Sequence, residues 1–283
     1  MPIRATSQIL EHALEGGYGV AAINIVNDLT LEAVLAAATA ADAPLIVQTS
    51  VKTVQSVGMR VLYTMFQEMA RDVPVPVALH LDHCPDRAVI TACLAQGWQS
   101  VLFDGSRMSV AENRAACAEI VVEAHALGAA VEGEIEPIRG VEDGIGSDEE
   151  SETQALDVAL DFIRFTGIDC FAPAIGNAHG TYKTAPRLDA QRVTDIVEAT
   201  GKPVALHGGT GMSADQFADL ISRGCAKVNI STALKVAYLT AGFDYLTAHP
   251  GEYDPPKVFA AQRQAVKDMA MHHIRMFGSV GKA

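Results

Sequence analysis

The chain alternates repeatedly between short runs of β-branched or apolar residues and longer runs with helical periodicity. The predicted strands are residues 19–26, 44–50, 76–83, 100–106, 129–136, 170–176, 203–209 and 227–232. Helical patterns follow them over 30–42, 58–71, 86–96, 109–127, 154–166, 189–200 and 213–223, and then over 233–247 and 256–277. Strands that alternate with helices form parallel sheets, because a parallel connection needs a crossover helix.

Eight such units without a compositional break predict an α/β fold, a closed (β/α)8 TIM barrel in a single domain over residues 1–283. A further helix at 5–16 is expected to cover the bottom of the barrel, and the C-terminal helices extend it. An open, doubly wound sheet is the alternative. That fold usually carries a glycine-rich fingerprint after its first strand, and GVAAINIVND has none.

Composition narrows the classes of partner. Hydrophobic residues make up 49% of the chain and the formal net charge is −13, so a large core is expected and a basic nucleic-acid-binding surface is not. No apolar run is long enough to predict a membrane span. The N-terminus lacks the apolar core of a signal peptide, and the five scattered cysteines fit reduced thiols. We therefore expect a cytoplasmic protein without a nucleic-acid or membrane partner.

Polar residues gather at the carboxyl ends of the predicted strands, where barrel enzymes assemble their sites. One such position means little, but polar side chains at all eight strand ends indicate a shared site. These residues include Asn24, Ser50, His80, Asp82, His83, Asp104, Glu132, Glu134, His179, His207, Asn229 and Ser231.

Four of these residues are histidines, and three of them come from different strand ends, namely His83, His179 and His207. Three protein ligands with an open fourth position are the usual catalytic arrangement for Zn²⁺. Such an ion polarises a carbonyl as a Lewis acid. The alternative is a set of hydrogen-bonded histidines in a polar barrel mouth.

Two carboxylates are candidates for proton transfer. Asp82 directly precedes His83 and is placed to exchange a proton with a substrate hydroxyl, or else to support a metal ligand. His80 shares a strand face with Asp82 and is expected to be structural. Glu142 lies in the polar segment 138–153, which we expect to be a mobile loop, and it is a candidate base next to a carbonyl. A solvated charged loop is the alternative.

Glycines follow two of the histidines, in AHGTYK (178–183) and HGGTG (207–211). Glycine lets the backbone approach a ligand, and successive N–H groups can bind an anion. The last two strands of many barrels hold phosphate, and Lys183 would add a cation. These segments therefore predict a phosphate site, with simple turns as the alternative.

Together these motifs resemble the class II, metal-dependent ketose-bisphosphate aldolases, a family that includes fructose-1,6-bisphosphate and tagatose-1,6-bisphosphate aldolases. The resemblance covers essentially the whole chain. It is carried by HLDH (80–83), LFDGS (102–106), VEGEIE (131–136) with GVEDG (140–144), AIGNAHGTYK (174–183), LHGGTG (206–211) and KVNIST (227–232). It implies a TIM-barrel lyase of carbohydrate metabolism, such as glycolysis, that forms dihydroxyacetone phosphate and glyceraldehyde 3-phosphate.

The resemblance also implies roles for individual residues. His83, His179 and His207 match the zinc ligands, with one catalytic ion per subunit, and Glu134 matches an alternative buried zinc ligand. Asp82 matches the acid/base for the C4 hydroxyl, and Glu142 the carboxylate that exchanges a proton at C3. A further set of positions matches the contacts to substrate and phosphate, namely Asn24, Ser50, Gly180, Lys183, Gly208, Gly209, Thr210, Asn229 and Ser231. In the family, Na⁺ or K⁺ often helps to bind the phosphate. Asp104 matches another polar position of the pocket, and we expect His80, Asp104 and Glu132 to support the site.

The sequence departs from the family pattern at two places. In EIEPIRGVED, Glu136 and Arg139 replace small residues ahead of the loop glutamate. In DPPK, Pro256 stands where many relatives carry an arginine that reaches a neighbouring subunit's second phosphate, with Lys257 next. The ketone-side phosphate site therefore matches the family and the aldehyde side does not.

Several functions consequently stay open at this point. A ketose 1,6-bisphosphate aldolase is favoured. An aldolase for another ketose phosphate, with a non-phosphorylated or other aldehyde, and a non-catalytic sugar-phosphate-binding relative are the alternatives. A metal-dependent isomerase or hydrolase usually has more carboxylate ligands. No lysine is evidently placed for a Schiff base, since Lys183 lies in a glycine turn and Lys227 begins a strand. Relatives form dimers and tetramers, so we expect a homodimer or homotetramer.

Overall fold

The computed structural model describes residues 2–142, 145–147, 153–180 and 187–283. Eight parallel strands close into a barrel in the order β1-β10-β9-β8-β5-β4-β3-β2. They are β1 (Val20–Asn24), β2 (Leu45–Ser50), β3 (Val77–Cys84), β4 (Ser100–Phe103), β5 (Ala130–Gly133), β8 (Cys170–Phe171), β9 (Val204–Leu206) and β10 (Cys225–Ile230). The predicted TIM barrel is confirmed, and every predicted strand overlaps an observed one.

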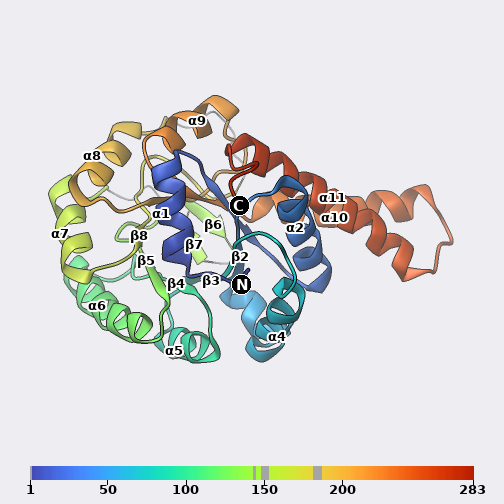
Figure 1. Cartoon of the computed structure of the whole chain (residues 1–283), viewed down its shortest axis with the longest axis horizontal. Helices are drawn as coiled ribbons and strands as arrows, with labels where there is room; N and C mark the ends of the chain where they lie inside the picture. Colours follow the sequence, from blue (N-terminus) through green and yellow to red (C-terminus); the bar gives the residue numbers. More distant parts are fainter. Residues whose placement is uncertain (1, 143–144, 148–152, 181–186) are drawn as a thin grey trace.

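Helices surround the barrel (Figure 1). They are α1 (Thr6–Gly16), α2 (Asp28–Ala41), α3 (Val51–Val57), α4 (Met59–Ala70), α5 (Arg87–Gln96), α6 (Val110–Ala126), α7 (Leu156–Thr166), α8 (Ala190–Thr200), α9 (Ala214–Ser222), α10 (Thr232–Ala248) and α11 (Pro255–Met276). Helix α1 crosses one end of the barrel, as the sequence predicted. Helix α3 was not predicted. It begins directly after β2, where the Ser50 side chain accepts a hydrogen bond from the Thr53 backbone N–H.

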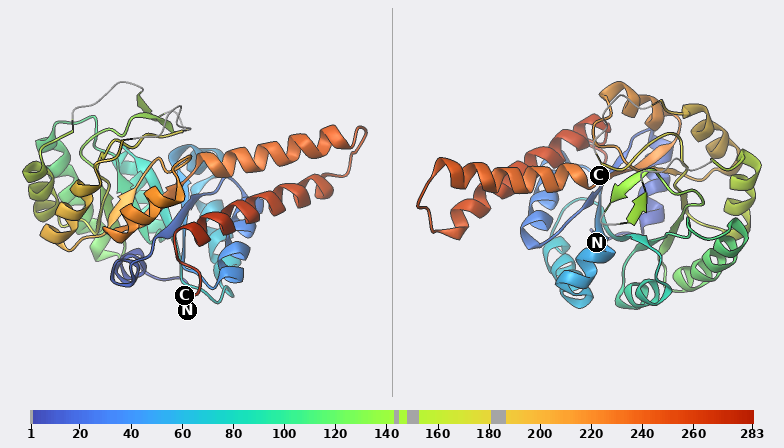
Figure 2. Two further views of the ribbon diagram at one scale, coloured as in Figure 1. Left: turned by 90° about the horizontal axis from the view of Figure 1, so that it is seen from above. Right: turned by 180° about the vertical axis from the view of Figure 1, so that it is seen from behind.

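The polar segment after β5 contains regular structure that the sequence did not predict. Strands β6 (Gly140–Glu142) and β7 (Ile145–Ser147) form a small antiparallel sheet. Figure 2 shows it over the end of the barrel opposite to α1. The backbone of Arg139 pairs with that of Ala178, which ties this segment to the loop after β8.

Small apolar residues fill the lower part of the barrel interior. Val20, Ala22, Ile46, Ala78, Cys170, Ala172, Ala205 and Ala226 pack there against Ile9, Leu10 and Ala13 of α1. A second, larger core lies between the strands and the surrounding helices. All five cysteines are buried and free of disulfides. Most inward polar side chains therefore lie in the upper half, although buried Ser100 accepts a hydrogen bond from Thr6 of α1 at the floor.

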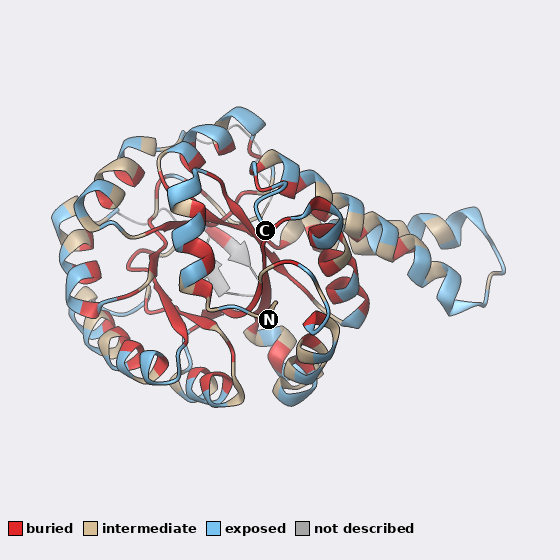
Figure 3. Cartoon of the chain, viewed as in Figure 1, coloured by how far each residue is buried: buried red, intermediate tan, exposed pale blue. Residues whose placement is uncertain are grey.

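Helices α10 and α11 form a long hairpin that projects from the barrel (Figure 2). Helix α11 returns to pack along α2, so only the far part of the hairpin is detached. Figure 3 shows that this far part is largely exposed. The exposed large apolar side chains of the hairpin are Val236, Leu239, Phe243, Leu246, Tyr253 and Phe259. No helix in the described part of the chain has the length and apolar character needed to cross a membrane.

Candidate metal centre at the barrel rim

Three histidines converge at the carboxyl ends of the strands. His83 lies in β3, His179 follows β8 and His207 follows β9. The Nδ1 atom of His207 lies 2.9 Å from the Nε2 atom of His83. The ring centres of His179 and His83 are 5.0 Å apart. Candidate ligand atoms of all three lie within 4.8 Å of one another, so the structure brings together the set that the sequence singled out.

A backbone irregularity in β3 places two consecutive residues in this site. Neighbouring residues of a regular strand face opposite sides, so Asp82 and His83 would ordinarily diverge. His83 instead has a φ of 43°, in the left-handed region, and the pairing of β3 with β4 shifts register between Leu81 and Cys84. Non-glycine residues in this region are uncommon and tend to mark functional sites. The irregularity turns both side chains toward the rim.

Two carboxylates face His83 from the other side. Its Nδ1 atom lies 3.4 Å from Asp104 Oδ2 and 3.7 Å from Glu134 Oε1, and these three residues form a second possible ligand set. Burial would lower the pKa of His83, but the carboxylates of Glu134 and Asp82 raise that pKa well above its usual value. Burial and the nearby Asp104 raise the pKa of Glu134 well above its usual value.

These residues fit a bound divalent cation. Glu134 is buried, and its Oε2 atom has no hydrogen-bond partner among the described residues. A buried carboxylate oxygen without a donor is costly unless a cation or proton neutralises it. Three imidazole nitrogens with carboxylates beside them are the donor types that Zn²⁺ takes in catalytic sites.

His207 is held in one orientation from below. Its Nε2 atom lies 2.7 Å from Glu132 Oε1, and the other Glu132 oxygen lies 2.8 Å from the Lys227 ammonium. Burial would raise the pKa of Glu132, but Lys227 and His207 hold that pKa well below its usual range. Burial lowers the pKa of His207 despite this carboxylate. When Nε2 donates to Glu132, the lone pair of Nδ1 faces His83 and the centre of the cluster.

Asp82 is oriented by two amides. Asn24 Nδ2 donates to Asp82 Oδ2 at 2.8 Å, and Asn229 Nδ2 donates to Asp82 Oδ1 at 3.2 Å. Gln48 Nε2 in turn donates to Asn24 Oδ1 at 2.6 Å. Gln48 was not among the predicted site residues. Alternation along β2 could have found it, because Gln48 shares the inward face with Ser50.

His80 and Ser100 continue the polar interior downward. Ser100 Oγ lies 2.7 Å from His80 Nδ1 and accepts a hydrogen bond from Thr6 Oγ1 of α1. His80 Nε2 lies 3.8 Å from Glu132 Oε2. His80 therefore lies behind the histidine cluster, on the side of the barrel floor.

Glycines bring the backbone close to the cluster. Gly208 has a φ of 65°, and a Cβ atom there would lie 2.1 Å from the Ala178 carbonyl oxygen. Asn177 Nδ2 donates to the His207 carbonyl, so these loops are fixed to each other. The Ser231 Oγ atom, at the start of α10, is buried without a hydrogen-bond partner in the described structure. Gly180, Gly209 and Thr210 lie on the same two loops, whereas Lys183 lies outside the described residues.

The residues that depart from the family pattern lie beside the centre rather than in it. Glu136 is buried and pairs with Arg192 of α8 at 2.7 Å. Gln154 joins this pair, because its N–H donates to Glu136 and its carbonyl accepts from Arg192. The Arg139 carbonyl accepts a 2.7 Å hydrogen bond from the His179 backbone N–H. Hydrogen bonds at Arg139 and at Gln154 thus hold the backbone on both sides of Glu142.

The Pro256 region lies at the far end of the α10–α11 hairpin (Figure 2). Lys257 Nζ is 2.9 Å from Glu252 Oε2 and is exposed. This end of the hairpin projects away from the chain's own barrel rim. Any contact of Lys257 with a substrate would therefore have to be made at another subunit.

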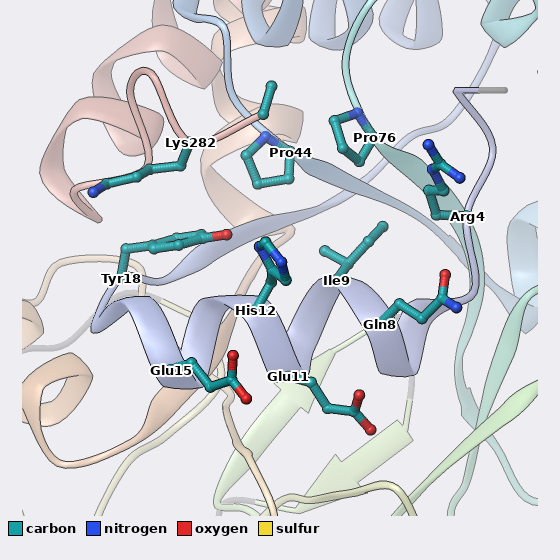
Figure 4. Close-up of a pocket in the computed structure, with 11 residues that line it drawn as sticks. Arg4, Gln8, Ile9, Glu11, His12, Glu15, Tyr18, Pro44, Pro76 and Lys282 are labelled. Atoms are coloured by element: carbon teal, nitrogen blue, oxygen red, sulfur yellow. The ribbon is translucent and has the colours of Figure 1, made fainter.

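A groove of about 490 Å³ lies at the opposite end of the barrel, along α1. Figure 4 shows Tyr18, Pro44 and Pro76 on its walls, with Glu11 and Glu15 of α1 directed away from the prolines. The charged side chains there are exposed, in contrast to those of the rim. Its lining brings no set of metal-ligating residues together among those described.

Comparison with known proteins agrees with this architecture. The model of the class-II fructose-bisphosphate aldolase family matches residues 4–282. The chain is 36% identical to a sulfofructosephosphate aldolase of Alkalicoccus urumqiensis, over 97% of this chain and 96% of that protein. It is 34% identical to a fructose-bisphosphate aldolase of Geobacillus stearothermophilus, over 100% of this chain and 99% of that protein.

Solved structures show the same likeness. The YdjI aldolase of Escherichia coli K12 superimposes with a TM-score of 0.87 at 30% identity, and 99% of each chain is covered. The fold and the rim define a (β/α)8 enzyme with a histidine cluster fitted for a cation. The chain belongs to the class-II fructose-bisphosphate aldolase family, and it is therefore a lyase of the aldolase type.

Proposed function

We propose that this chain is a zinc-dependent aldolase that reversibly cleaves a ketose 1,6-bisphosphate, of the fructose or tagatose type, to dihydroxyacetone phosphate and glyceraldehyde 3-phosphate. The observation that carries the proposal is the convergence of His83, His179 and His207 beside Asp82. His83, His179 and His207 would hold the zinc ion, with Glu134 as an alternative ligand. When bound, zinc supplies a Lewis acid that polarises the substrate carbonyl.

Asp82 is the proposed acid/base for the C4 hydroxyl. Both of its oxygens accept amide hydrogens, from Asn24 and Asn229. These donors fix the direction of the carboxylate and leave it as the hydrogen-bond acceptor of both contacts. A carboxylate held in this way accepts the hydroxyl proton during cleavage and returns it during condensation.

Glu142 is the proposed base at C3, and its segment is fastened over the barrel mouth through Glu136, Arg192 and the Arg139 carbonyl. The ketone-side phosphate is assigned to the loops of Gly180, Gly208, Gly209 and Thr210, to Ser231 and to Lys183, together with Na⁺ or K⁺. Ser231 supports this assignment, because a buried hydroxyl without a partner at a helix start suits an anion. Ser50 and Asn24 complete the proposed substrate contacts.

A ketose phosphate with another aldehyde-side group is the second candidate substrate. Two observations favour it. One relative is named sulfofructosephosphate aldolase, and the Pro256–Lys257 sequence departs from the family pattern on the aldehyde side. A sulfonate and a phosphate are both anions, so the ketone-side chemistry would be the same for either substrate.

The test is a cleavage assay over fructose and tagatose 1,6-bisphosphates, their 1-phosphates and the 6-sulfo analogue. Metal content is measured on the same sample. We expect cleavage of at least one substrate, its loss after complete removal of metal by a chelator and its return with Zn²⁺. Cleavage that continues after complete metal removal would contradict the zinc mechanism. Binding without cleavage across the panel would contradict the proposed ketose-phosphate substrates.

We also propose that the chain acts in the cytoplasm as a homodimer or homotetramer. The exposed apolar row on the α10–α11 hairpin supports self-association, because Leu239 and Phe243 are 65% and 69% exposed. Sedimentation analysis of the wild type and of Phe243→Glu tests this. We expect the substitution to shift the protein toward monomers, and an unchanged mass would argue against this face.

A further inference from the structure

Lys227 is the one lysine of the described residues that is buried. It lies in β10, and its side chain is fully enclosed. Charged side chains are almost never fully buried unless they are paired. The ammonium meets this condition through two contacts, one to Glu132 Oε2 at 2.8 Å and one to Asn229 Oδ1 at 2.7 Å. Each contact leads to a different part of the proposed catalytic centre.

The first contact leads to the metal ligand His207. Lys227 compensates the charge of Glu132, which remains an acceptor for His207 Nε2 at 2.7 Å. An acceptor at Nε2 fixes the tautomer that leaves the Nδ1 lone pair facing His83. Residues that orient a metal-binding histidine in this way commonly change metal affinity when they are replaced.

The second contact leads to Asp82. Because Lys227 has three donors and no acceptor, the Asn229 group that faces it must be the carbonyl oxygen. The Asn229 NH₂ group then has to face Asp82, at 3.2 Å. A flipped amide would place NH₂ against the ammonium and a carbonyl oxygen against the Asp82 carboxylate. Both contacts would then be repulsive.

We propose that Lys227 is a positioning residue that orients the metal ligand His207 through Glu132 and the acid/base Asp82 through Asn229. The inference rests on the proposed function and deepens it. One buried cation at the base of the rim would thus couple the direction of a metal-binding lone pair to the direction of a proton acceptor. The same pairing explains why this lysine does not serve as a Schiff-base nucleophile. Its ammonium is engaged by a carboxylate and an amide oxygen.

The test compares Lys227→Met with Lys267→Met in the full chain. Methionine keeps an unbranched chain of similar length and removes the charge. Lys267, a half-buried lysine of α11, serves as the matched control for losing an ammonium. The readouts are the zinc dissociation constant from chelator competition, the visible spectrum of the Co²⁺-loaded protein, and kcat. Lys227→Met is expected to weaken zinc binding by about 10- to 100-fold, to alter the Co²⁺ spectrum and to lower kcat. The control is expected to match the wild type.

A double variant separates positioning from general destabilisation. Glu132→Gln combined with Lys227→Met removes both buried charges and keeps an amide oxygen that can accept from His207. We expect this protein to recover most of the zinc affinity and the Co²⁺ spectrum. Its turnover should stay low, because Asn229 still lacks the cation that orients it.

The inference is overturned if Lys227→Met binds zinc and turns over like the wild type, or if the double variant binds zinc as poorly as the single one. If Lys227→Met does not fold, the double variant alone tests the inference. Wild-type turnover in it would overturn the proposal, and zinc binding with reduced turnover would support it. A wild-type protein that cleaves no ketose phosphate would contradict the proposed function but would not by itself contradict this inference. The zinc affinities and Co²⁺ spectra can still be compared in that case.

Discussion

Charged side chains are buried at one end of the barrel and exposed to solvent at the other. At the rim, a continuous chain of contacts joins five buried residues, namely Glu134, His83, His207, Glu132 and Lys227. At the floor, small side chains such as Ala22 and Ala78 fill the interior, and the charges of α1 lie outside in water. Burying polar groups is costly unless they are paired, so a dense buried network marks the end where chemistry takes place. Substitutions at the two ends should therefore differ in their effects.

Removal of a rim histidine should have the largest effect. We expect His207→Ala to lose stoichiometric zinc and to lower kcat/KM by at least about 10³-fold. A metal Lewis acid contributes several kcal/mol, and each ~1.4 kcal/mol is a factor of ten. Metal analysis and steady-state kinetics measure both effects. A variant that retained zinc and activity would exclude His207 as a ligand.

Asp82→Ala should remove proton transfer while leaving the metal in place. We expect kcat to fall by about 10²- to 10⁴-fold, the usual contribution of a positioned acid/base. Zinc content should remain near that of the wild type, because Asp82 orients toward Asn24 and Asn229 rather than completing the histidine set. Loss of zinc in parallel with activity would instead assign Asp82 to the metal.

Gly208→Ala should disturb the backbone of the rim. The new Cβ atom would lie 2.1 Å from the Ala178 carbonyl, and the left-handed φ alone costs about 1–2 kcal/mol. We expect a lower melting temperature and a raised KM for phosphorylated substrates. Gly201→Ala, at a left-handed position with nothing within 4 Å of its Cβ, is the control for the φ cost alone. Equal effects from the two substitutions would remove the argument for close packing at Gly208.

Substitutions at the floor should have the smallest effects. His12→Ala, in the groove shown in Figure 4, is expected to change the free energy of unfolding by no more than about 0.5 kcal/mol. We expect kcat and KM to be unchanged, because His12 is exposed and lies at the opposite end from the histidine cluster. Chemical denaturation and kinetics measure this. A marked loss of turnover would show that the floor is coupled to the rim.

Much of the fold could be predicted from the sequence, because its periodicities are local. Each strand and helix of the barrel carries its own pattern of alternation or helical spacing. The β6–β7 sheet was missed, since its residues are polar, glycine-rich and without an alternating pattern. Helix α3 was missed because its short sequence, VKTVQSV, follows β2 without a break and depends on the Ser50 cap.

The candidate site was predictable in its members but not in its contacts. The histidines and Asp82 could be chosen because they stand at strand ends. The partners of Lys227 could not, because Glu132 is ninety-five residues away in the chain and only barrel closure brings the two together. The backbone shift at His83 was also invisible, since regular alternation predicts that Asp82 and His83 point apart. Glu136 could be recognised as unusual, but its pairing with Arg192 of α8 required the structure.

The irregular backbone of β3 has a consequence for how the centre tolerates motion. The proposed proton carrier and a proposed metal ligand are joined by a single peptide unit, whose Cα atoms are about 3.8 Å apart whatever the surrounding loops do. Thermal breathing of the barrel can displace His179 and His207 on their separate loops. It cannot lengthen the peptide link between Asp82 and His83, so bond geometry fixes the spacing of their Cα atoms, while Asn24 and Asn229 fix the direction of the Asp82 carboxylate.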